Sequence, residues 1–199
     1  MNFTCSYLKE TKNIIEKINL DSVEKLIDLI FVVKKNKGRI FFLGNGGSAA
    51  NCSHAVNDFR KILGIECYAP TDNVSEITAR TNDEGWDTIF VEWLKISNLC
   101  DKDLLFILSV GGGDIEKNIS SNLVQAIKYA KLKGSKITGI VGRNGGYTAE
   151  NSNTCIIIPT VNKDNVTPHT EAFHAIIWHL LVSHPKLKFN QSKKESKEF

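Results

Sequence analysis

The sequence predicts an α/β fold, a doubly wound parallel sheet flanked by helices, preceded by an N-terminal helical extension. Short apolar runs that are typical of buried strands alternate with segments of helical periodicity. Two of these runs end in glycine-rich turns. Strand–helix alternation favours a parallel sheet covered on both faces, in which ligands bind beyond the carboxyl ends of the strands.

The predicted strands share apolar cores bounded by glycine, proline or polar residues. They fall at residues 40–43, 62–69, within 101–110, at 135–142 and at 154–159. The predicted helices are two within residues 4–37, one after Ser48, and four at about 75–80, 88–96, 115–133 and 170–183. The first two helices either pack on the domain or build an oligomer interface, and we favour the interface.

Composition limits the function classes. A chain of 199 residues fits one domain, here divided into N-terminal helices (1–37), an α/β core (38–185) and a polar tail (186–199). The net charge of +3 sits partly in the tail, so no basic field for nucleic acid is indicated. Five scattered cysteines without a Cys-x-x-Cys pair argue against a disulfide framework and a cysteine zinc cluster. With neither a signal-like start nor a run of membrane-spanning length, we expect a cytoplasmic protein with no membrane partner.

The first glycine-rich turn is the centre of the functional prediction. The apolar run 40–43 leads into Gly44-Asn45-Gly46-Gly47-Ser48. Glycines allow positive φ and close approach of a ligand, and Ser48 is expected to cap the following helix. Unpaired N–H groups and the helix dipole at such a start favour an anion such as phosphate. The spacing matches neither the dinucleotide fingerprint nor the nucleoside-triphosphate loop, so a plain strand-to-helix turn is the alternative.

Two predicted helices carry histidines near carboxylates. His54 and Asp58 are four residues apart and share a helix face, and the last helix carries Glu171, His174 and His179. Two histidines plus carboxylates would suit a catalytic divalent metal, with zinc the most natural ion. A solvated or core-satisfied pair is the commoner outcome for an arbitrary His and Asp, and spacing alone does not show that the two helices meet.

These motifs together resemble the sugar isomerase (SIS) domain family. The similarity rests on the first turn with His54 and Asp58, on Asn82-Asp83, on Ser109 with its glycine-rich turn, and on the helix segment TPHTEAFHAIIWHLL. It is strongest to the phosphoheptose isomerase branch, which acts on sedoheptulose 7-phosphate in lipopolysaccharide-core and nucleotide-heptose synthesis. The resemblance implies a flavodoxin-like SIS fold, a phosphosugar aldose–ketose isomerase, and a homotetramer (or homodimer) with active sites at subunit contacts.

The resemblance also implies the site residues. One zinc ion per site would be held by His54, Asp58, Glu171 and His179, where the family carries glutamate for Asp58 and glutamine for Glu171. Asp58 and His179 would be the general base and acid, in either order. The implied substrate contacts are Asn45, Gly46, Gly47, Ser48, Asp83, Ser109, Gly111, Asp114 and Glu171.

The second glycine-rich turn departs from the family pattern. Where the family has Ser-x-Ser-Gly-x-Ser, this chain has Ser109-Val110-Gly111-Gly112-Gly113-Asp114, which lacks two hydroxyls and adds a carboxylate. A carboxylate beside a phosphate costs roughly several tenths to a few kcal/mol, depending on the local dielectric. The glycine N–H groups can still form an anion-binding nest, and Asp114 either caps the following helix or accepts a sugar hydroxyl. The sugar, phosphorylated or not, is therefore open, and a non-catalytic SIS module that binds a sugar phosphate or another protein is the alternative function.

Overall fold

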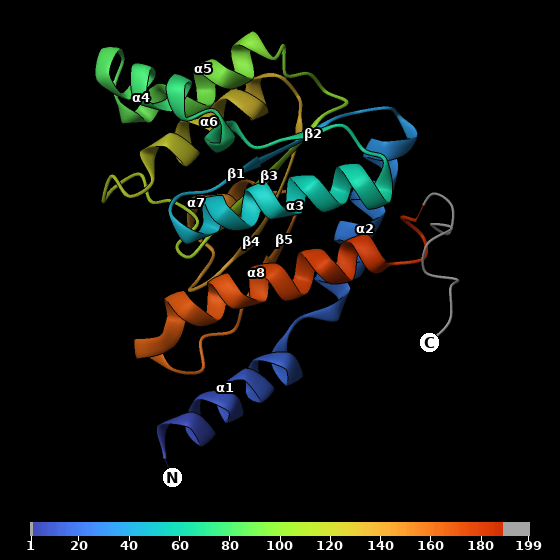
Figure 1. Cartoon of the computed structure of the whole chain (residues 1–199), viewed down its shortest axis with the longest axis vertical. Coiled ribbons are helices and arrows are strands. Elements are labelled where there is room, and N and C mark those ends of the chain that lie inside the picture. The colour runs from blue at the N-terminus through green and yellow to red at the C-terminus, as the bar shows by residue number, and fades with distance from the viewer. Residues whose placement is uncertain (1, 189–199) are drawn as a thin grey trace.

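The computed structural model describes residues 2–188 and confirms the predicted fold class. Five parallel strands form one sheet in the order β2-β1-β3-β4-β5 (Figure 1). The strands are β1 (Ile40–Leu43), β2 (Cys67–Tyr68), β3 (Leu104–Ser109), β4 (Lys136–Val141) and β5 (Thr154–Ile157). The order reverses between β1 and β3, and this switch point is where doubly wound sheets bind ligands.

Helices cover both faces of the sheet. They are α1 (Phe3–Lys17), α2 (Leu20–Lys35), α3 (Gly47–Leu63), α4 (Val74–Asp83), α5 (Ile89–Ile96), α6 (Ser121–Leu132), α7 (Gly146–Asn151) and α8 (Val166–Ser183), with short 3₁₀ turns η1 (Pro70–Asp72), η2 (Trp86–Thr88) and η3 (Lys163–Asn165). Alternate side chains of β1 point to opposite faces, so Phe42 packs in one core with α2, α3 and α8, and Phe41 in the other with α5 and α6. Helices α3 and α8, which carry the predicted histidine and carboxylate residues, therefore cover the same face of the sheet.

Helix α7 was not predicted, and several element boundaries differ from the predictions. The predicted strand 62–69 is short because α3 continues to Leu63 and ends at Gly64, whose φ of 65° is left-handed. The helix predicted from residue 115 begins at Ser121, after a loop closed by a bridge between Asp114 and Ile119. Helix α8 begins at Val166, four residues before the predicted start, because proline is tolerated in a first helical turn.

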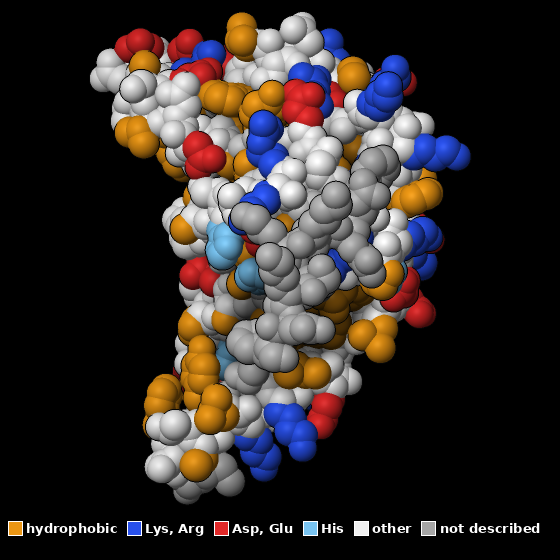
Figure 2. Space-filling model, turned by 45° about the vertical axis from the view of Figure 1, so that its right-hand side comes forward, with side chains coloured by type: hydrophobic (Ala, Val, Ile, Leu, Met, Phe, Trp, Pro, Cys, Tyr) orange, Lys and Arg blue, Asp and Glu red, His pale blue; other side chains and the backbone are white. Residues whose placement is uncertain are grey.

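The N-terminal helix α1 extends away from the sheet (Figure 1). Its side chains Phe3, Leu8 and Ile15 are 74%, 63% and 57% exposed. Figure 2 shows hydrophobic side chains gathered at the end of the molecule where α1 lies, and histidine side chains reaching the surface at mid-height. The predicted interface role of these helices stays a prediction, and residues 189–199 of the predicted tail lie outside the described residues. Within the described part of the chain, no helix is long and apolar enough to cross a membrane.

Polar contacts join α1 to the start of α8. The Glu10 carboxylate accepts hydrogen bonds from the side-chain amides of Asn165 and Asn162, at 2.9 and 2.7 Å, and lies 2.8 Å from Nε2 of His169. These hydrogen bonds, with that of Asn165 the strongest, lower the pKa of Glu10 to about 2. The ring of Tyr7 stacks on His169 at 4.4 Å between centroids. The middle of α1 is therefore held beside the start of α8.

Candidate metal centre and substrate turns

Helices α3 and α8 lie side by side and bring His54, Asp58 and His179 together (Figure 1). One nitrogen or oxygen atom from each side chain lies within 4.8 Å of the other two. Oδ2 of Asp58 is 3.9 Å from Nε2 of His54 and 3.7 Å from Nε2 of His179. The i,i+4 spacing alone could align only the first two of these side chains, and the packing of the helices supplies the third.

The orientation of His179 leaves one nitrogen available. Its Nδ1 lies 2.8 Å from the backbone oxygen of Ala175, and a carbonyl can only accept, so Nδ1 carries the proton. In the neutral imidazole Nε2, which faces Asp58, therefore keeps its lone pair. A histidine fixed in this way by its second nitrogen is typical of metal ligands.

The three side chains fit a catalytic divalent metal. The His54 and His179 side chains are 58% and 51% exposed, whereas that of Asp58 is 14% exposed. Two imidazoles and one carboxylate open to solvent on one side make the donor set of a zinc site with three protein ligands and a free position. Sequence reasoning predicted these three residues, and the structure brings them together.

Glu171, the fourth predicted ligand, lies elsewhere. A Cβ built on Gly47 would lie 2.6 and 2.7 Å from the two carboxylate oxygens of Glu171, so the carboxylate lies over the start of α3. Asn51 donates a hydrogen bond of 3.1 Å to the backbone oxygen of Glu171, which holds the two helices in this register. Glu171 and His179 are eight residues apart, about 12 Å along the helix axis. The structure thus groups Glu171 with the first glycine-rich turn and not with the three clustered side chains.

The first turn is built differently from the prediction. Ser48 does not cap α3: the helix begins at Gly47, its N-cap is Gly46 with φ 59°, and no side chain caps it. Ser48 is 3% exposed within the first helical turn. A Cβ at Gly46 would meet nothing within 4 Å, so space for a ligand lies above this backbone.

The side chain of Asn45 is hydrogen-bonded to Asn122, a residue that the sequence analysis did not identify. The side-chain amides of Asn45 and Asn122 exchange two hydrogen bonds, of 3.1 and 2.9 Å, and Asn122 is fully buried near the start of α6. Asn122 also accepts from the backbone N–H of Leu123 at 2.9 Å. No motif singles out an asparagine inside an ordinary helix, so only the tertiary structure shows this pair.

The second turn satisfies its own polar groups. Oγ of Ser109 accepts a hydrogen bond of 3.0 Å from the N–H of Gly112, whose φ is 72° and whose hypothetical Cβ would lie 1.9 Å from the Gly145 oxygen. Oδ1 of Asp114 accepts from the N–H of Lys117 at 3.0 Å, and Oδ2 lies 3.3 Å from Nζ of Lys117. The hydrogen bond from the Lys117 N–H chiefly lowers the pKa of Asp114. Asp114 therefore caps its own loop and not α6, while Gly111 has open space above it.

Asp83 lies apart from these groups. It is the last residue of α4, is exposed, and accepts a hydrogen bond of 2.7 Å from the Asn82 amide. In Figure 1, α4 lies on the opposite side of α3 from α8. Within one chain, the structure does not bring Asp83 to the His54–Asp58–His179 cluster.

His174 is fully buried beneath the second turn and is not part of the cluster. Neither ring nitrogen has a hydrogen-bonding partner among the described residues. Burial lowers the pKa of His174 to about 4, an effect that the backbone groups of Ile140 and Ser109 only partly offset. His174 is therefore a neutral core residue at physiological pH.

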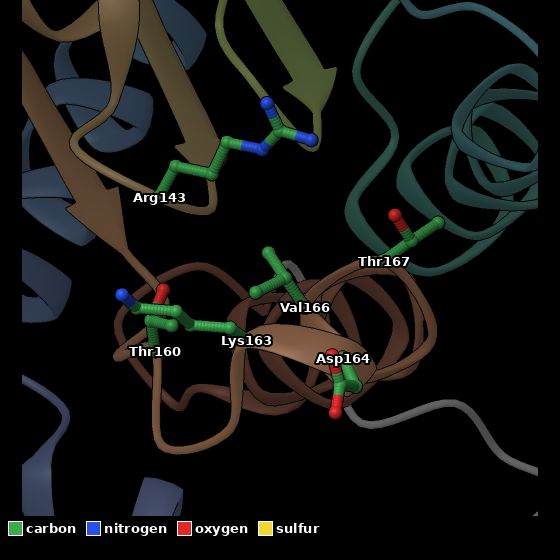
Figure 3. Close-up of a pocket in the computed structure, with 6 residues that line it drawn as sticks. All are labelled: Arg143, Thr160, Lys163, Asp164, Val166 and Thr167. Carbon is green, nitrogen blue, oxygen red and sulfur yellow. The ribbon is translucent and has the colours of Figure 1, made fainter.

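A cleft of about 330 Å³ opens between the end of β4 and the start of α8 (Figure 3). The guanidinium of Arg143 extends over it, and the amino group of Lys163 lies on the other side beside Thr160. The preceding Gly142 N–H donates to the backbone oxygens of Ser109 and Val110, at 3.3 and 3.1 Å. Arg143, with a left-handed φ of 51°, thus brings a positive charge next to the second turn.

Comparison with known proteins agrees with this architecture. The family model described as SIS domain matches residues 6–142. Phosphoheptose isomerase of Rhodospirillum rubrum is 33% identical over 149 residues, covering 72% of this chain and 73% of that protein. The enzyme of the same name from Aneurinibacillus thermoaerophilus is 28% identical over 188 residues, 89% of each chain.

Solved structures show the same fold. The phosphoheptose isomerase structure from Neisseria gonorrhoeae matches with a TM-score of 0.77 at 23% identity, covering 90% of this chain and 95% of that one. A phosphoheptose isomerase from Francisella tularensis matches with a TM-score of 0.77 at 21% identity, covering 92% and 97%. The similarity therefore extends over the sheet and its surrounding helices.

Proposed function

Because the chain belongs to the SIS domain family, we propose that it is an isomerase that interconverts the aldose and ketose forms of a phosphorylated sugar. Relatives named phosphoheptose isomerase make sedoheptulose 7-phosphate the first candidate substrate. The observation that carries the proposal is the cluster of His54, Asp58 and His179 on the two packed helices. A non-catalytic sugar-phosphate-binding module would have no need for these three groups within 4.8 Å of one another.

The proposed reaction moves a proton between C1 and C2 through an enediol. A bound divalent ion, most naturally zinc held by His54, Asp58 and His179, would supply positive charge to the oxygen that gains electrons. Because Nδ1 of His179 is committed to Ala175, its Nε2 can serve either as a ligand or in proton transfer, but not both at once. Asp58 has two oxygens, so it can ligate through one and accept a proton through the other. We therefore assign proton transfer between C1 and C2 to Asp58, and His179 would act as the acid only when its Nε2 is protonated and does not ligate the ion.

The substrate is proposed to lie across the two glycine-rich turns, at the switch point of the sheet. The open backbone at Gly46 and Gly111 supports this position, because a Cβ built on either residue would meet no atom within 4 Å. The Glu171 carboxylate beside Gly47 suits the hydroxyl groups of a sugar better than its phosphate. The phosphate is accordingly proposed to lie at the second turn, where Lys117 offsets the charge of Asp114 and Arg143 extends over the neighbouring cleft.

Assembly into a homotetramer, or a homodimer, completes the proposal. The exposed apolar residues of α1 would be covered by a second copy of the chain. The exposed Asp83, remote from the cluster within one chain, would reach a substrate only across such a contact.

The direct test combines metal analysis with turnover. Purified protein is loaded with zinc, its metal content is measured, and a panel of sugar phosphates including sedoheptulose 7-phosphate is assayed for aldose–ketose conversion. We expect bound zinc and activity in the wild type, and loss of both in His54→Ala and His179→Ala. Unchanged metal content and activity in these variants would refute the assignment, and a metal-free, inactive wild type would favour the binding module.

A further inference from the structure

Trp178 lies directly against both histidines of the cluster. The indole ring centroid is 4.5 Å from that of His54 and 3.5 Å from that of His179, with interplanar angles of 60° and 30°. Trp178 is fully buried, whereas both imidazoles are about half exposed. We propose that Trp178 is a positioning residue that holds His54 and His179 in the orientation needed to bind a divalent metal. This inference rests on the proposed metal site.

The two imidazoles have few other restraints. His179 makes one hydrogen bond, through Nδ1 to Ala175. Within residues 2–188 no hydrogen bond to the His54 ring is found, and its nearest charged neighbour, Asp58, is 3.9 Å away. A half-exposed side chain with free torsions loses rotamer entropy when a ligand immobilises it. Contact with a rigid, buried indole removes part of this cost before the metal arrives.

The buried indole N–H of Trp178 destabilises the folded core. Nε1 of Trp178 is buried and has no hydrogen-bonding partner among the described residues. An unpaired buried donor destabilises the folded state, so an apolar side chain of similar volume would suit the core better. Such violations of core chemistry are expected at functional sites. The position of Trp178 beneath two metal-ligand candidates supplies the functional reason.

The size of the indole explains why this residue type is needed. The two imidazole centroids are 5.5 Å apart and nearly perpendicular to each other. The bicyclic indole lies close to both rings, whereas a single phenyl ring in the same cavity covers less of this span. Tryptophan thereby couples the positions of two ligands that belong to different helices, α3 and α8.

The test compares Trp178→Phe and Trp178→Leu with the wild type, and uses Trp93→Phe as a matched control. Trp93, in α5, also has a buried, unpaired Nε1, but it packs against the opposite core. Zinc affinity is measured by competition with a chromophoric chelator, and Co²⁺ absorption spectra report the ligand geometry. We expect about 10- to 100-fold weaker zinc binding in Trp178→Leu, a smaller loss in Trp178→Phe, and wild-type binding in Trp93→Phe.

A second measurement needs no metal. The indole ring current should shift the imidazole proton resonances of His54 and His179 upfield in the apo protein, and this shift should vanish in Trp178→Leu. Wild-type zinc affinity and unchanged imidazole resonances in folded Trp178→Leu and Trp178→Phe would overturn the inference and leave the metal site intact. If the wild type binds no zinc, both the metal site and this inference fail.

Discussion

Replacing the buried His174 should make the free energy of unfolding depend less on pH in the acid range. The ring is fully buried without hydrogen-bonding partners among the described residues, and burial lowers its pKa from 6.5 to about 4. Between these two values the unfolded chain binds a proton that the folded chain does not. The free energy of unfolding therefore falls as the pH drops from 6.5 towards 4.

The size of the effect follows from the shift. One pKa unit corresponds to about 1.4 kcal/mol, so the full loss below pH 4 is about 3 kcal/mol, of which about 2 kcal/mol is lost by pH 5. His174→Leu keeps a similar side-chain volume and removes two unpaired nitrogens, so its stability at pH 7.5 should equal or exceed that of the wild type. At pH 5 the variant should be the more stable protein by about 2 kcal/mol or more.

The assay is urea unfolding of both proteins at pH 7.5 and pH 5, at one fixed protein concentration because oligomerisation would couple to unfolding. Other titrating groups are common to both proteins and cancel in the difference. If wild type and His174→Leu lose the same stability between the two pH values, His174 does not stay neutral in the fold and the reasoning is wrong.

Three further predictions concern the turns and the N-terminal helix. Gly47→Ala should push the Glu171 carboxylate from the start of α3 and change KM. In a Glu171→Ala background the same substitution should leave KM unchanged. A double-mutant cycle without coupling between the two substitutions would contradict the contact of Gly47 with Glu171. Arg143→Ala should raise KM for a phosphorylated sugar with little change in kcat or zinc content, and equal KM values would remove Arg143 from phosphate recognition. Glu10→Gln should lower Tm at pH 7. The difference in Tm between wild type and variant should narrow as the pH falls from 4.5 towards 2, because the folded pKa of Glu10 is about 2. A difference in Tm that stays constant over this range in thermal melts would argue against the lowered pKa.

The sequence predicted an element best where an apolar run was followed directly by a glycine that marked its end. The run 40–43 ended at a glycine and became β1 with the predicted bounds. Prediction was wrong at the start of the helix after β3: it was placed at about Ile115, but Ile115 is 51% exposed in a loop and the helix begins at Ser121. Pro168 concealed the first turn of α8, since proline more often marks a boundary than a helix interior.

Spacing along the chain predicted only the local parts of the candidate site, and the resemblance to the SIS family was needed to group His179 with His54 and Asp58. His54 and Asp58 follow from helical spacing, whereas their approach to His179 depends on the packing of α3 against α8. Trp178 has the periodicity of a core residue, and nothing in the sequence shows that it lies under two histidines. Burial and contact across helices are properties of the tertiary structure, and a single sequence does not display them.

The paired amides of Asn45 and Asn122 have a consequence for how the protein receives its ligand. They tie the loop after β1 to the start of the helix after β3, across the point where the strand order reverses. The distance between these two elements is thereby held before any ligand binds, so a ligand that lies against them need not bear the entropy of ordering them. Ligand binding at this edge of the sheet should therefore require little rearrangement of these two elements, and the side chains around them should decide specificity.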